Sequence, residues 1–465
     1  MVPFPTQSHL NQLLQLSHLI ASYGLQVHYA GSTVHNRQVK LRDQNSERES
    51  QVTRAKFLKV KFHDFKLGPY SMPSPDPNAP ANAPSHLQPL RLATVGLREP
   101  IFGLLKELAA KYRRIIVIHD TLMSCVVQDV RSIPNAEVYT FHVTSAFALF
   151  YGRWESMAEK PFQIEGVPTR VPCNEGYNTT SDFKDFIVSQ IRLSLELASG
   201  SINNSSRLIE CKFIELYQKL PVNSKIRHFA LGPFNPIEKT VGVAEEYKNR
   251  HRCLQWLDQQ EIQSVIYVSF GTLTSMTDDQ IAELAIGLEK SGQKFIWALL
   301  VADKGDIFVK DDAGDQKRRP KLPDNYEERV KNRGLVVTEW APQLDILAHP
   351  STGGFVSHCG WSSCVESISM GVAIAAWPIT SDQPKNAVLL TEVLGVGVLV
   401  RDWEQRSKVV DSSTVENAVR KLMQTEEGEE IRKRAAQLGR DVRASCAKGG
   451  SSRLEFDSFV SHITR

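Results

Sequence analysis

One segment of the sequence concentrates residues that could hold an anionic ligand rich in hydroxyl groups. From Trp340 to Gln383 it reads WAPQLDILAHPSTGGFVSHCGWSSCVESISMGVAIAAWPITSDQ. A glycine pair allows a tight turn into a short apolar run at Phe355–Ser357, and a helix is expected directly after Gly360. Free backbone N–H groups at the start of such a helix bind phosphate, and a glycine lets the ligand approach closely. The segment therefore predicts a phosphate site where a strand ends and a helix begins.

Polar side chains of the same segment extend this site beyond the phosphate. His358 and the hydroxyls of Ser362 and Ser363 add hydrogen-bond donors, and Glu366 one turn later can accept from ribose hydroxyls. Asp382 and Gln383 form a polar pair suited to sugar hydroxyls, and Trp340 can stack on a base. Each of these residues taken alone would be an ordinary cap or core side chain. The ordered combination is what indicates a nucleotide-sugar site.

A second pair of residues could carry acid–base chemistry. His9 lies at the start of the first expected helix, and Asp120 follows the apolar run Arg114–His119. In an open parallel sheet both positions face the crevice where ligands bind. A histidine whose other ring nitrogen is held by a carboxylate is a competent general base near neutral pH. The pair is a candidate for removing a proton from a hydroxyl group.

The elements that must position these residues alternate between short β-branched runs and amphipathic helices. The runs expected as strands are Leu25–Ala30, Phe57–Phe62, Arg114–His119, Glu137–Phe141, Val265–Phe270, Phe295–Leu300, Leu335–Thr338, Gly354–Val356, Val372–Ala376 and Gly395–Val400. Helical patterns such as Asp278–Ser291 and Ser362–Met370 separate them, and the first helix is expected to stop at Gly24. Such alternation predicts α/β architecture with two doubly wound parallel-sheet domains, each covered by helices on both faces.

Length and composition limit the possible functions. A chain of 465 residues is too long for one ordinary core, so two domains of about 200 residues each are expected. The formal net charge is +3 and the charges are scattered, which argues against a nucleic-acid partner. No apolar stretch approaches the roughly 20 residues of a membrane span. The odd number of cysteines, seven, is typical of reduced thiols in a cytoplasmic protein.

The segment ending at Gln383 resembles the signature box of the plant family 1 UDP-sugar transferases and has the same length. CLQWLD at Cys253–Asp258, VSFGT at Val268–Thr272 and PFPTQSH before Leu10 extend the resemblance over essentially the whole chain. It implies two Rossmann-like domains of the GT-B type that face each other across a cleft. We expect an acceptor-binding domain at 1–234, a linker at 235–250, a UDP-sugar-binding domain at 251–445 and a helix at 446–465 that returns to the first domain.

The same resemblance assigns roles residue by residue. His9 would be the catalytic base and Asp120 its partner. Trp340 would stack on uracil, Ala341 and Gln343 would contact uracil and ribose, and Glu366 would hold the ribose. Thr272, His358 and Ser363 would meet the diphosphate at the helix start after Gly360. Trp361, Asp382 and Gln383 would read the sugar.

Departures from the family pattern concern three places. The family usually has Asn where this chain has Ser362, so a weaker or water-bridged contact is expected and an Asn restored there should tighten donor binding. Ser8 replaces the usual glycine before the histidine. A strand is expected just before the first helix, yet only Met1–Pro5 is there to form it, so the first strand is expected to be truncated, with residues upstream absent.

The implied reaction is inverting transfer of glucose from UDP-glucose to a hydroxyl of a small plant metabolite, without a metal ion or another cofactor. No acidic pair of the DxD type stands in the box, and the cysteines lack zinc spacing. The chain is expected to act as a monomer.

The acceptor half resembles the zeatin O-glucosyltransferase branch in PFPTQSHLNQLLQLSHLIASYG, IVIHDTLMS and FHVTSAFALFYGRW. Aromatic residues expected to line its acceptor pocket are Phe102, Phe147, Phe150, Tyr151, Trp154 and Phe162. Other hydroxylated terpenoids or phenolics, xylose in place of glucose, and a catalytically silent homologue that only binds nucleotide sugars stay open as alternatives. A nicotinamide-dependent dehydrogenase is disfavoured, since no GxGxxG follows an early strand.

Overall fold

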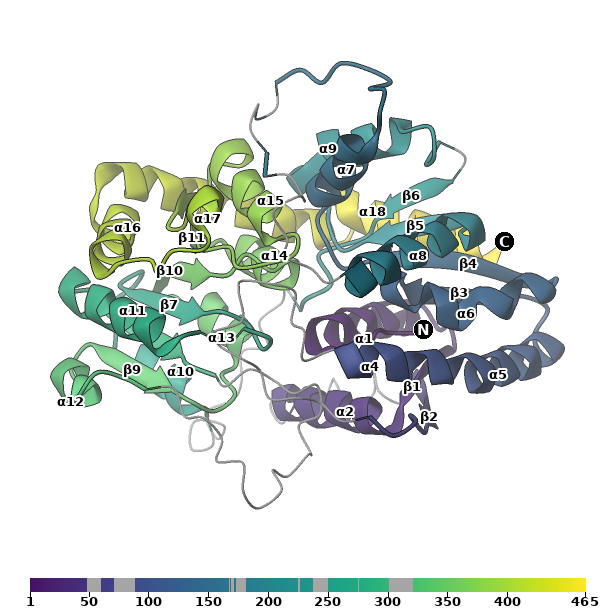
Figure 1. Cartoon of the computed structure of the whole chain (residues 1–465), viewed down its shortest axis with the longest axis horizontal. Helices are drawn as coiled ribbons and strands as arrows, with labels where there is room; N and C mark the ends of the chain where they lie inside the picture. Colours follow the sequence, from purple (N-terminus) through teal and green to yellow (C-terminus); the bar gives the residue numbers. More distant parts are fainter. Residues whose placement is uncertain are drawn as a thin grey trace.

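The computed structural model describes residues 1–47, 60–70, 88–166, 168, 171–172, 181–224, 226–236, 250–274, 276–300 and 321–465. Within them, short parallel strands alternate with helices in two lobes (Figure 1). Most of the linker expected at 235–250 lies outside the described residues, as does Cys173.

The first lobe is built on strands β1 to β6. Their bounds are β1 (Val27–Ser32), β2 (Val60–Phe65), β3 (Ile115–Asp120), β4 (Ala136–His142), β5 (Gly200–Asn203) and β6 (Arg227–Ala230). All pairings are parallel, in the orders β1-β2 and β3-β4-β5-β6. The sequence did not indicate β5 and β6, which have only four residues each.

Met1 and Val2 lie between β1 and β3 and connect the two sheets. The Val2 N–H donates to Ile118 O at 2.9 Å, and the Asp120 N–H donates to Val2 O at 3.0 Å. On the other side the Ala30 N–H donates to Met1 O at 2.9 Å. The first strand is therefore present as a single bridge at the centre of the layer.

Helices cover both faces of this layer. They are α1 (Gln7–Ser22), α2 (Thr33–Glu47), α4 (Gln88–Thr94), α5 (Arg98–Lys111), α6 (Ser124–Val127), α7 (Ala146–Ser156), α8 (Ser181–Leu197) and α9 (Arg207–Lys219), with short 3₁₀ turns η2 (Val95–Leu97), η3 (Thr121–Met123) and η4 (Gln128–Ser132). Helix α1 buries Leu10, Leu13 and Leu14, and Gly24 follows its end with a φ of 83°. The predicted stop is confirmed, because glycine adopts this backbone conformation without steric cost.

The second lobe is one six-stranded parallel sheet in the order β12-β11-β10-β7-β8-β9. The strands are β7 (Val265–Ser269), β8 (Lys294–Ala298), β9 (Gly334–Val337), β10 (Thr352–Ser357), β11 (Ala373–Ala376) and β12 (Gly397–Leu399). The chain runs outward from β7 to β9 and then returns to pair β10 with β7. The sheet therefore has a topological switch point between β7 and β10, where open α/β sheets bind ligands.

The helices of the second lobe are α10 (Arg252–Leu257), α11 (Asp278–Ser291), α12 (Tyr326–Val330), α13 (Gln343–Ala348), α14 (Trp361–Met370), α15 (Gln383–Val388), α16 (Ser412–Gln424) and α17 (Glu426–Cys446), with a π turn η7 (Leu389–Val393) and a 3₁₀ turn η8 (Trp403–Gln405). Helix α11 has the predicted bounds because its ends carry strong signals. The Thr277 side chain caps its first turn, and Gly292 follows its last residue with a φ of 70°.

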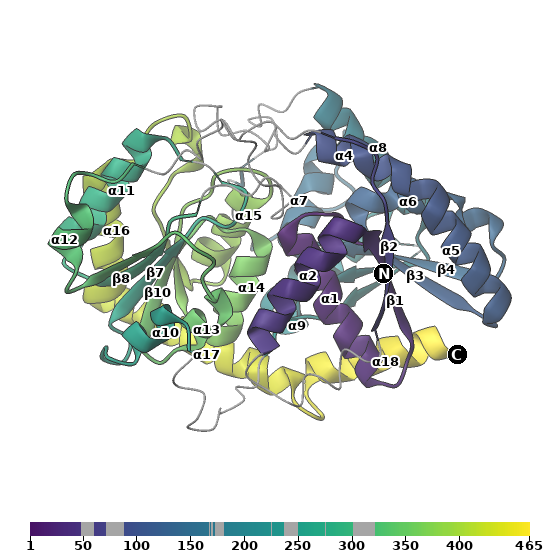
Figure 2. The same ribbon diagram turned by 90° about the horizontal axis from the view of Figure 1, so that it is seen from below.

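The last helix, α18 (Ser451–Thr464), lies against the first lobe, although α17 before it packs on α14 in the second lobe (Figure 2). Phe456 and Phe459 of α18 join the core formed by Tyr139 of β4 and Phe229 of β6. Ring centroids of Tyr139 and Phe459 are 5.5 Å apart. None of the described helices is long and apolar enough to cross a membrane.

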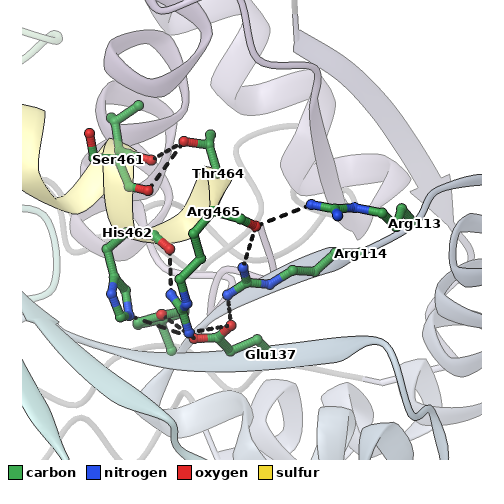
Figure 3. Close-up of polar contacts among 9 residues, drawn as sticks. Arg113, Arg114, Glu137, Ser461, His462, Thr464 and Arg465 are labelled. Atoms are coloured by element: carbon green, nitrogen blue, oxygen red, sulfur yellow. Dashed lines mark hydrogen bonds and ion pairs between the residues drawn. The ribbon is translucent and has the colours of Figure 1, made fainter.

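Polar contacts fix the end of α18 on the same strands (Figure 3). The Glu137 carboxylate of β4 accepts from the Arg465 guanidinium at 3.1 Å and forms an ion pair with Arg114 at the start of β3. Arg113 and Arg114 both donate to the Arg465 backbone oxygen at 3.2 Å. The charged cluster places α18 across the edge of the sheet where β3 and β4 begin.

Candidate active site

The structure brings His9 and Asp120 together, as expected from the sequence. His9 Nδ1 lies 2.6 Å from Asp120 Oδ2, with His9 20% exposed and Asp120 1% exposed. The other carboxylate oxygen of Asp120 accepts from the Leu122 backbone N–H at 2.8 Å. An ionised carboxylate only accepts, so Nδ1 carries the proton and Nε2 is left as the acceptor of the ring. Asp120 thus caps the turn η3 and orients His9 at once.

Their positions follow from the order of the strands. Met1 and Val2 lie beside β3, so the chain leaves this central bridge and enters α1 at the edge where β3 also ends. His9 comes from the first turn of α1, and Asp120 is the last residue of β3. The Phe4 ring meets the His9 ring edge-on at 5.4 Å between centroids and limits its rotation.

A second cluster joins Gln343, Ser363 and Glu366 at the facing ends of α13 and α14. The Gln343 amide donates to Ser363 Oγ at 3.0 Å and to Glu366 Oε2 at 2.7 Å. Burial raises the pKa of Glu366 to about 7, and the hydrogen bond from Gln343 opposes this rise. The carboxylate accepts this one hydrogen bond and has further lone pairs for hydroxyl donors.

Trp340 comes shortly before Gln343 in the chain, in the segment between β9 and α13. Its side chain is 42% exposed, whereas Ala341 next to it is buried at 6%. A large indole at the carboxyl end of a strand, held by buried neighbours, offers a flat apolar surface for a base. The stacking role expected from the resemblance stays a prediction.

His358 occupies the switch point between β7 and β10. Cβ atoms added to Gly271 and Gly360 would lie 2.8 and 2.5 Å from its ring, so both positions need glycine for the imidazole to fit. Burial lowers the pKa of His358 to about 4, which makes the ring neutral at physiological pH. His358 can therefore help a leaving group only as a neutral hydrogen-bond donor. Thr272 follows Gly271 at the end of β7 and lies on the same edge of the sheet.

The Trp361 ring is buried between the lobes, and the expected role of Trp361 in reading the sugar stays a prediction. The side chain is 2% exposed, and its indole N–H donates to the backbone oxygen of Asn204 at 2.9 Å. The reason is that α14 begins where the two lobes touch, so its first side chain packs into the interface. The backbone N–H groups of Trp361, Ser362 and Ser363, in the first turn of α14, have no acceptor within the helix.

Asp382 and Gln383 are already partly engaged by protein groups. Asp382 Oδ2 accepts from Thr144 Oγ1 at 2.6 Å and from Asn386 Nδ2 at 2.9 Å. Gln383 Oε1 accepts from the N–H groups of Ile379 and Thr380 at 2.9 and 2.8 Å. The second oxygen of Asp382 and the amide nitrogen of Gln383 are the atoms that a sugar could meet.

The aromatic residues expected around the acceptor divide into core and cleft candidates. Phe147 and Phe150 are 0% exposed and pack with Phe213, so their assignment to a pocket wall is wrong. Phe102 lies on α5 and is half-buried against the first lobe's core, and Tyr151 is buried at 6%. The helical period of α7 turns this face inward, which the abundance of aromatic residues alone does not reveal. Trp154 and Phe162 are half-buried with ring centroids 4.9 Å apart, and they stay candidates.

Four polar residues at the interface of the lobes escaped the sequence analysis: Gln12, Thr144, Asn204 and Asn386. Asn386 donates to Cys359 O at 2.9 Å and accepts from Ser145 Oγ at 2.6 Å, while Gln12 donates to Ser362 Oγ. One signal in the sequence could have identified Gln12. It follows His9 by three residues, so it lies on the same face of α1, and it interrupts an otherwise apolar pattern. Within the described residues no group of three or more His, Cys, Asp or Glu side chains is placed to hold a metal ion.

Two family models cover most of the chain. One described as "Glycosyltransferase, N-terminal domain" matches residues 1–236, and one described as "UDP-glucoronosyl and UDP-glucosyl transferase" matches residues 228–441. Among curated proteins, the chain is 47% identical to a zeatin O-glucosyltransferase of Phaseolus lunatus, over all of this chain and 96% of the relative. It is 46% identical to a zeatin O-xylosyltransferase of Phaseolus vulgaris over all of this chain and 97% of the relative. A cis-zeatin O-glucosyltransferase 1 of Zea mays is 36% identical over all of this chain and 97% of the relative.

Solved structures give the same fold. The chain superimposes with a TM-score of 0.76 on TcCGT1 in complex with UDP, at 25% identity over all of this chain and 98% of that chain. It superimposes with a TM-score of 0.77 on UGT73P12 of Glycyrrhiza uralensis in complex with glycyrrhetinic acid 3-O-monoglucuronide, at 24% identity over all of this chain and 94% of that chain. The expected architecture of two Rossmann-like lobes is confirmed.

Proposed function

The chain belongs to the family of UDP-glucosyl transferases, and from this premise we propose that it transfers glucose from UDP-glucose to the side-chain hydroxyl of a zeatin-type cytokinin. The observation that carries the proposal is the direct contact between α1, which bears the general base His9, and the start of α14. Gln12, one turn after His9, donates to Ser362 in the first turn of α14. A proton acceptor and a helix start suited to a diphosphate therefore lie side by side.

The reaction follows from the contact between His9 and Asp120. His9 Nε2 takes the proton of the acceptor hydroxyl while the hydroxyl oxygen bonds to the anomeric carbon of the sugar. The bond between that carbon and the diphosphate oxygen breaks on the opposite face, so an α-linked donor gives a β-glycoside through an oxocarbenium-like transition state. Asp120 stabilises the imidazolium that forms.

The departing UDP gains negative charge, which the second lobe is built to receive. The free N–H groups at the start of α14 and its helix dipole attract anions. Neutral His358, together with Thr272 and Ser363, adds oriented donors that need no reorganisation during the reaction. Trp340, Ala341, Gln343 and Glu366 would bind the uridine, and Asp382 and Gln383 the sugar.

Support for the zeatin-type acceptor comes from the three relatives reported above, all of which carry zeatin in their names. Trp154 and Phe162 offer a half-buried aromatic surface of the kind that a purine stacks against. The sugar is less decided, because the chain is almost equally similar to a glucosyl and to a xylosyl transferase. We assign glucose as the donor sugar and make xylose an arm of the test.

The decisive experiment is mass spectrometry of products from trans-zeatin, cis-zeatin and a panel of hydroxylated terpenoids and phenolics, each with UDP-glucose and UDP-xylose. A zeatin O-glucoside as the main product supports the proposal. Products only with other acceptors would replace the cytokinin assignment, and UDP-glucose binding without any product would identify a silent homologue.

We further propose that the protein works as a cytoplasmic monomer without a metal ion, with domains at 1–234 and 251–445 and the helix of 446–465 returning to the first. The six described cysteines are free, as a reducing compartment requires. Sedimentation of the purified chain tests the monomer, and imaging of a fluorescent fusion tests the cytoplasmic location.

A further inference from the structure

Gln12 is buried between the lobes and takes part in a hydrogen-bond chain that ends at the donor site. Its side chain is 5% exposed and belongs to α1, the helix of His9. Gln12 Oε1 accepts from Asn204 Nδ2 at 2.9 Å, and Gln12 Nε2 donates to Ser362 Oγ at 2.5 Å. The two lobes thus meet at an amide from one and a hydroxyl from the other.

One backbone N–H group sets the donor and the acceptor of every hydrogen bond between Asn204, Gln12 and Ser362. The Phe234 N–H, which can only donate, points to Asn204 Oδ1 at 3.0 Å. The Asn204 amide nitrogen must then face Gln12, so Gln12 presents its oxygen to Asn204 and its nitrogen to Ser362. Ser362 Oγ consequently accepts from Gln12, and its own hydrogen is left to be donated elsewhere.

Ser362 stands where the family that this chain resembles usually has Asn, an amide that can donate to a phosphate or sugar oxygen. In this chain the amide is supplied by Gln12 from the opposite lobe, and its nitrogen reaches the Ser362 hydroxyl. We propose that Gln12 is a positioning residue that fixes Ser362 as a hydrogen-bond donor to the nucleotide sugar, so that the two residues together replace the usual Asn. The proposal rests on the proposed function, since it takes the start of α14 as the site of the diphosphate.

This arrangement reverses the expectation that Asn at position 362 tightens donor binding. A longer side chain there would meet the Gln12 amide, which already occupies the adjoining space. It also links the lobes, because the same bond that orients Ser362 holds α1, and with it His9, against α14. The contact between Gln12 and Ser362 then fixes the positions of both the bound donor and the general base on α1.

The test measures the dissociation constant of UDP-glucose by titration calorimetry without acceptor. Gln12→Ala should weaken binding about fivefold to tenfold, the range of one net hydrogen bond. In a Ser362→Ala background the same change should alter binding by less than about twofold, because Gln12 acts through Ser362 and contacting residues are not additive. Ser362→Asn should weaken binding, and adding Gln12→Ala to it should restore binding.

Gln15→Ala is the matched control, because it makes the same change one turn further along α1. It should leave the dissociation constant unchanged, and kinetics should place the Gln12 effect in the KM of UDP-glucose rather than the KM of the acceptor. The inference would be overturned if Gln12→Ala changed the dissociation constant equally in the wild type and in Ser362→Ala. Tighter binding of UDP-glucose by Ser362→Asn alone would overturn it as well. If Gln12→Ala does not fold, Ser362→Asn alone decides. A wild-type protein that binds UDP-glucose but forms no product would instead contradict the proposed function.

Discussion

Donor binding should depend on pH through Glu366. Burial raises the pKa of this carboxyl group to about 7, and Gln343 donates to it at 2.7 Å. The ionised form accepts hydrogen bonds from both ribose hydroxyls, whereas the protonated form must donate one of its own. About one tenth of the group is ionised one pH unit below its pKa and about nine tenths one unit above. Because only the ionised fraction binds, the dissociation constant of UDP-glucose should be about tenfold larger at pH 6 than at pH 8.

The assay is calorimetric titration with UDP-glucose at several pH values. UDP itself is avoided because a terminal phosphate titrates at about pH 6. Glu366→Gln keeps the shape and an oxygen for Gln343 but cannot titrate, so its affinity should be independent of pH. An affinity of the wild type that is constant from pH 6 to 8, or a variant with the same slope, would refute the reasoning.

Stability of the unliganded protein should change in the opposite direction. The ordinary value for this carboxyl is 4.5, so between that value and about pH 7 the folded state binds more protons than the unfolded state. The free energy of unfolding contributed by Glu366 therefore falls as pH rises through this window. Thermal melts of the wild type and Glu366→Gln without ligand should diverge with increasing pH, the variant becoming relatively more stable.

The remaining predictions concern catalysis. His9→Ala should lower kcat with zeatin by about 10²–10⁴-fold, as expected for a general base, and calorimetry should give an unchanged affinity for UDP; an equal loss of UDP binding would make His9 structural. Asp120→Asn should slow transfer by about 10⁴-fold while the melting temperature changes little, because the amide oxygen can stay on the Leu122 N–H while the amide nitrogen donates to His9 and forces the wrong tautomer. Transfer rates in excess EDTA should match those with added magnesium, and a strict requirement for a divalent ion would contradict the role given to α14 and His358.

The sequence predicts elements well where their ends carry physical signals. Helix α11 begins after a threonine cap and ends at a glycine, and its bounds are as predicted. Strands β5 and β6 are only four residues long. The sequence of β5, GSIN, holds a single β-branched residue, Ile202, and so does not stand out from a loop. Their pairing depends on neighbouring strands rather than on local propensity.

Candidate site residues were found when their roles follow from position along a strand or helix. His9 follows the bridge formed by Val2, and Asp120 is the last residue of the neighbouring strand β3. Both therefore lie at the same edge of the sheet, where they meet. The direction in which a side chain points is harder to predict. Phe147 and Phe150 face the core, and the Trp361 ring faces the other lobe, because contacts distant in sequence decide both.

The placement of α18 imposes an order on biosynthesis. Phe456 and Phe459 close a core with Leu10, Tyr139 and Phe229, residues that leave the ribosome long before them. Until Ser451–Thr464 has been made, the first lobe keeps part of that apolar face in water, although all its strands are complete. Exposed apolar surface on a nascent domain favours aggregation and binding by chaperones. The first lobe therefore cannot finish folding ahead of the second, and the two lobes mature together.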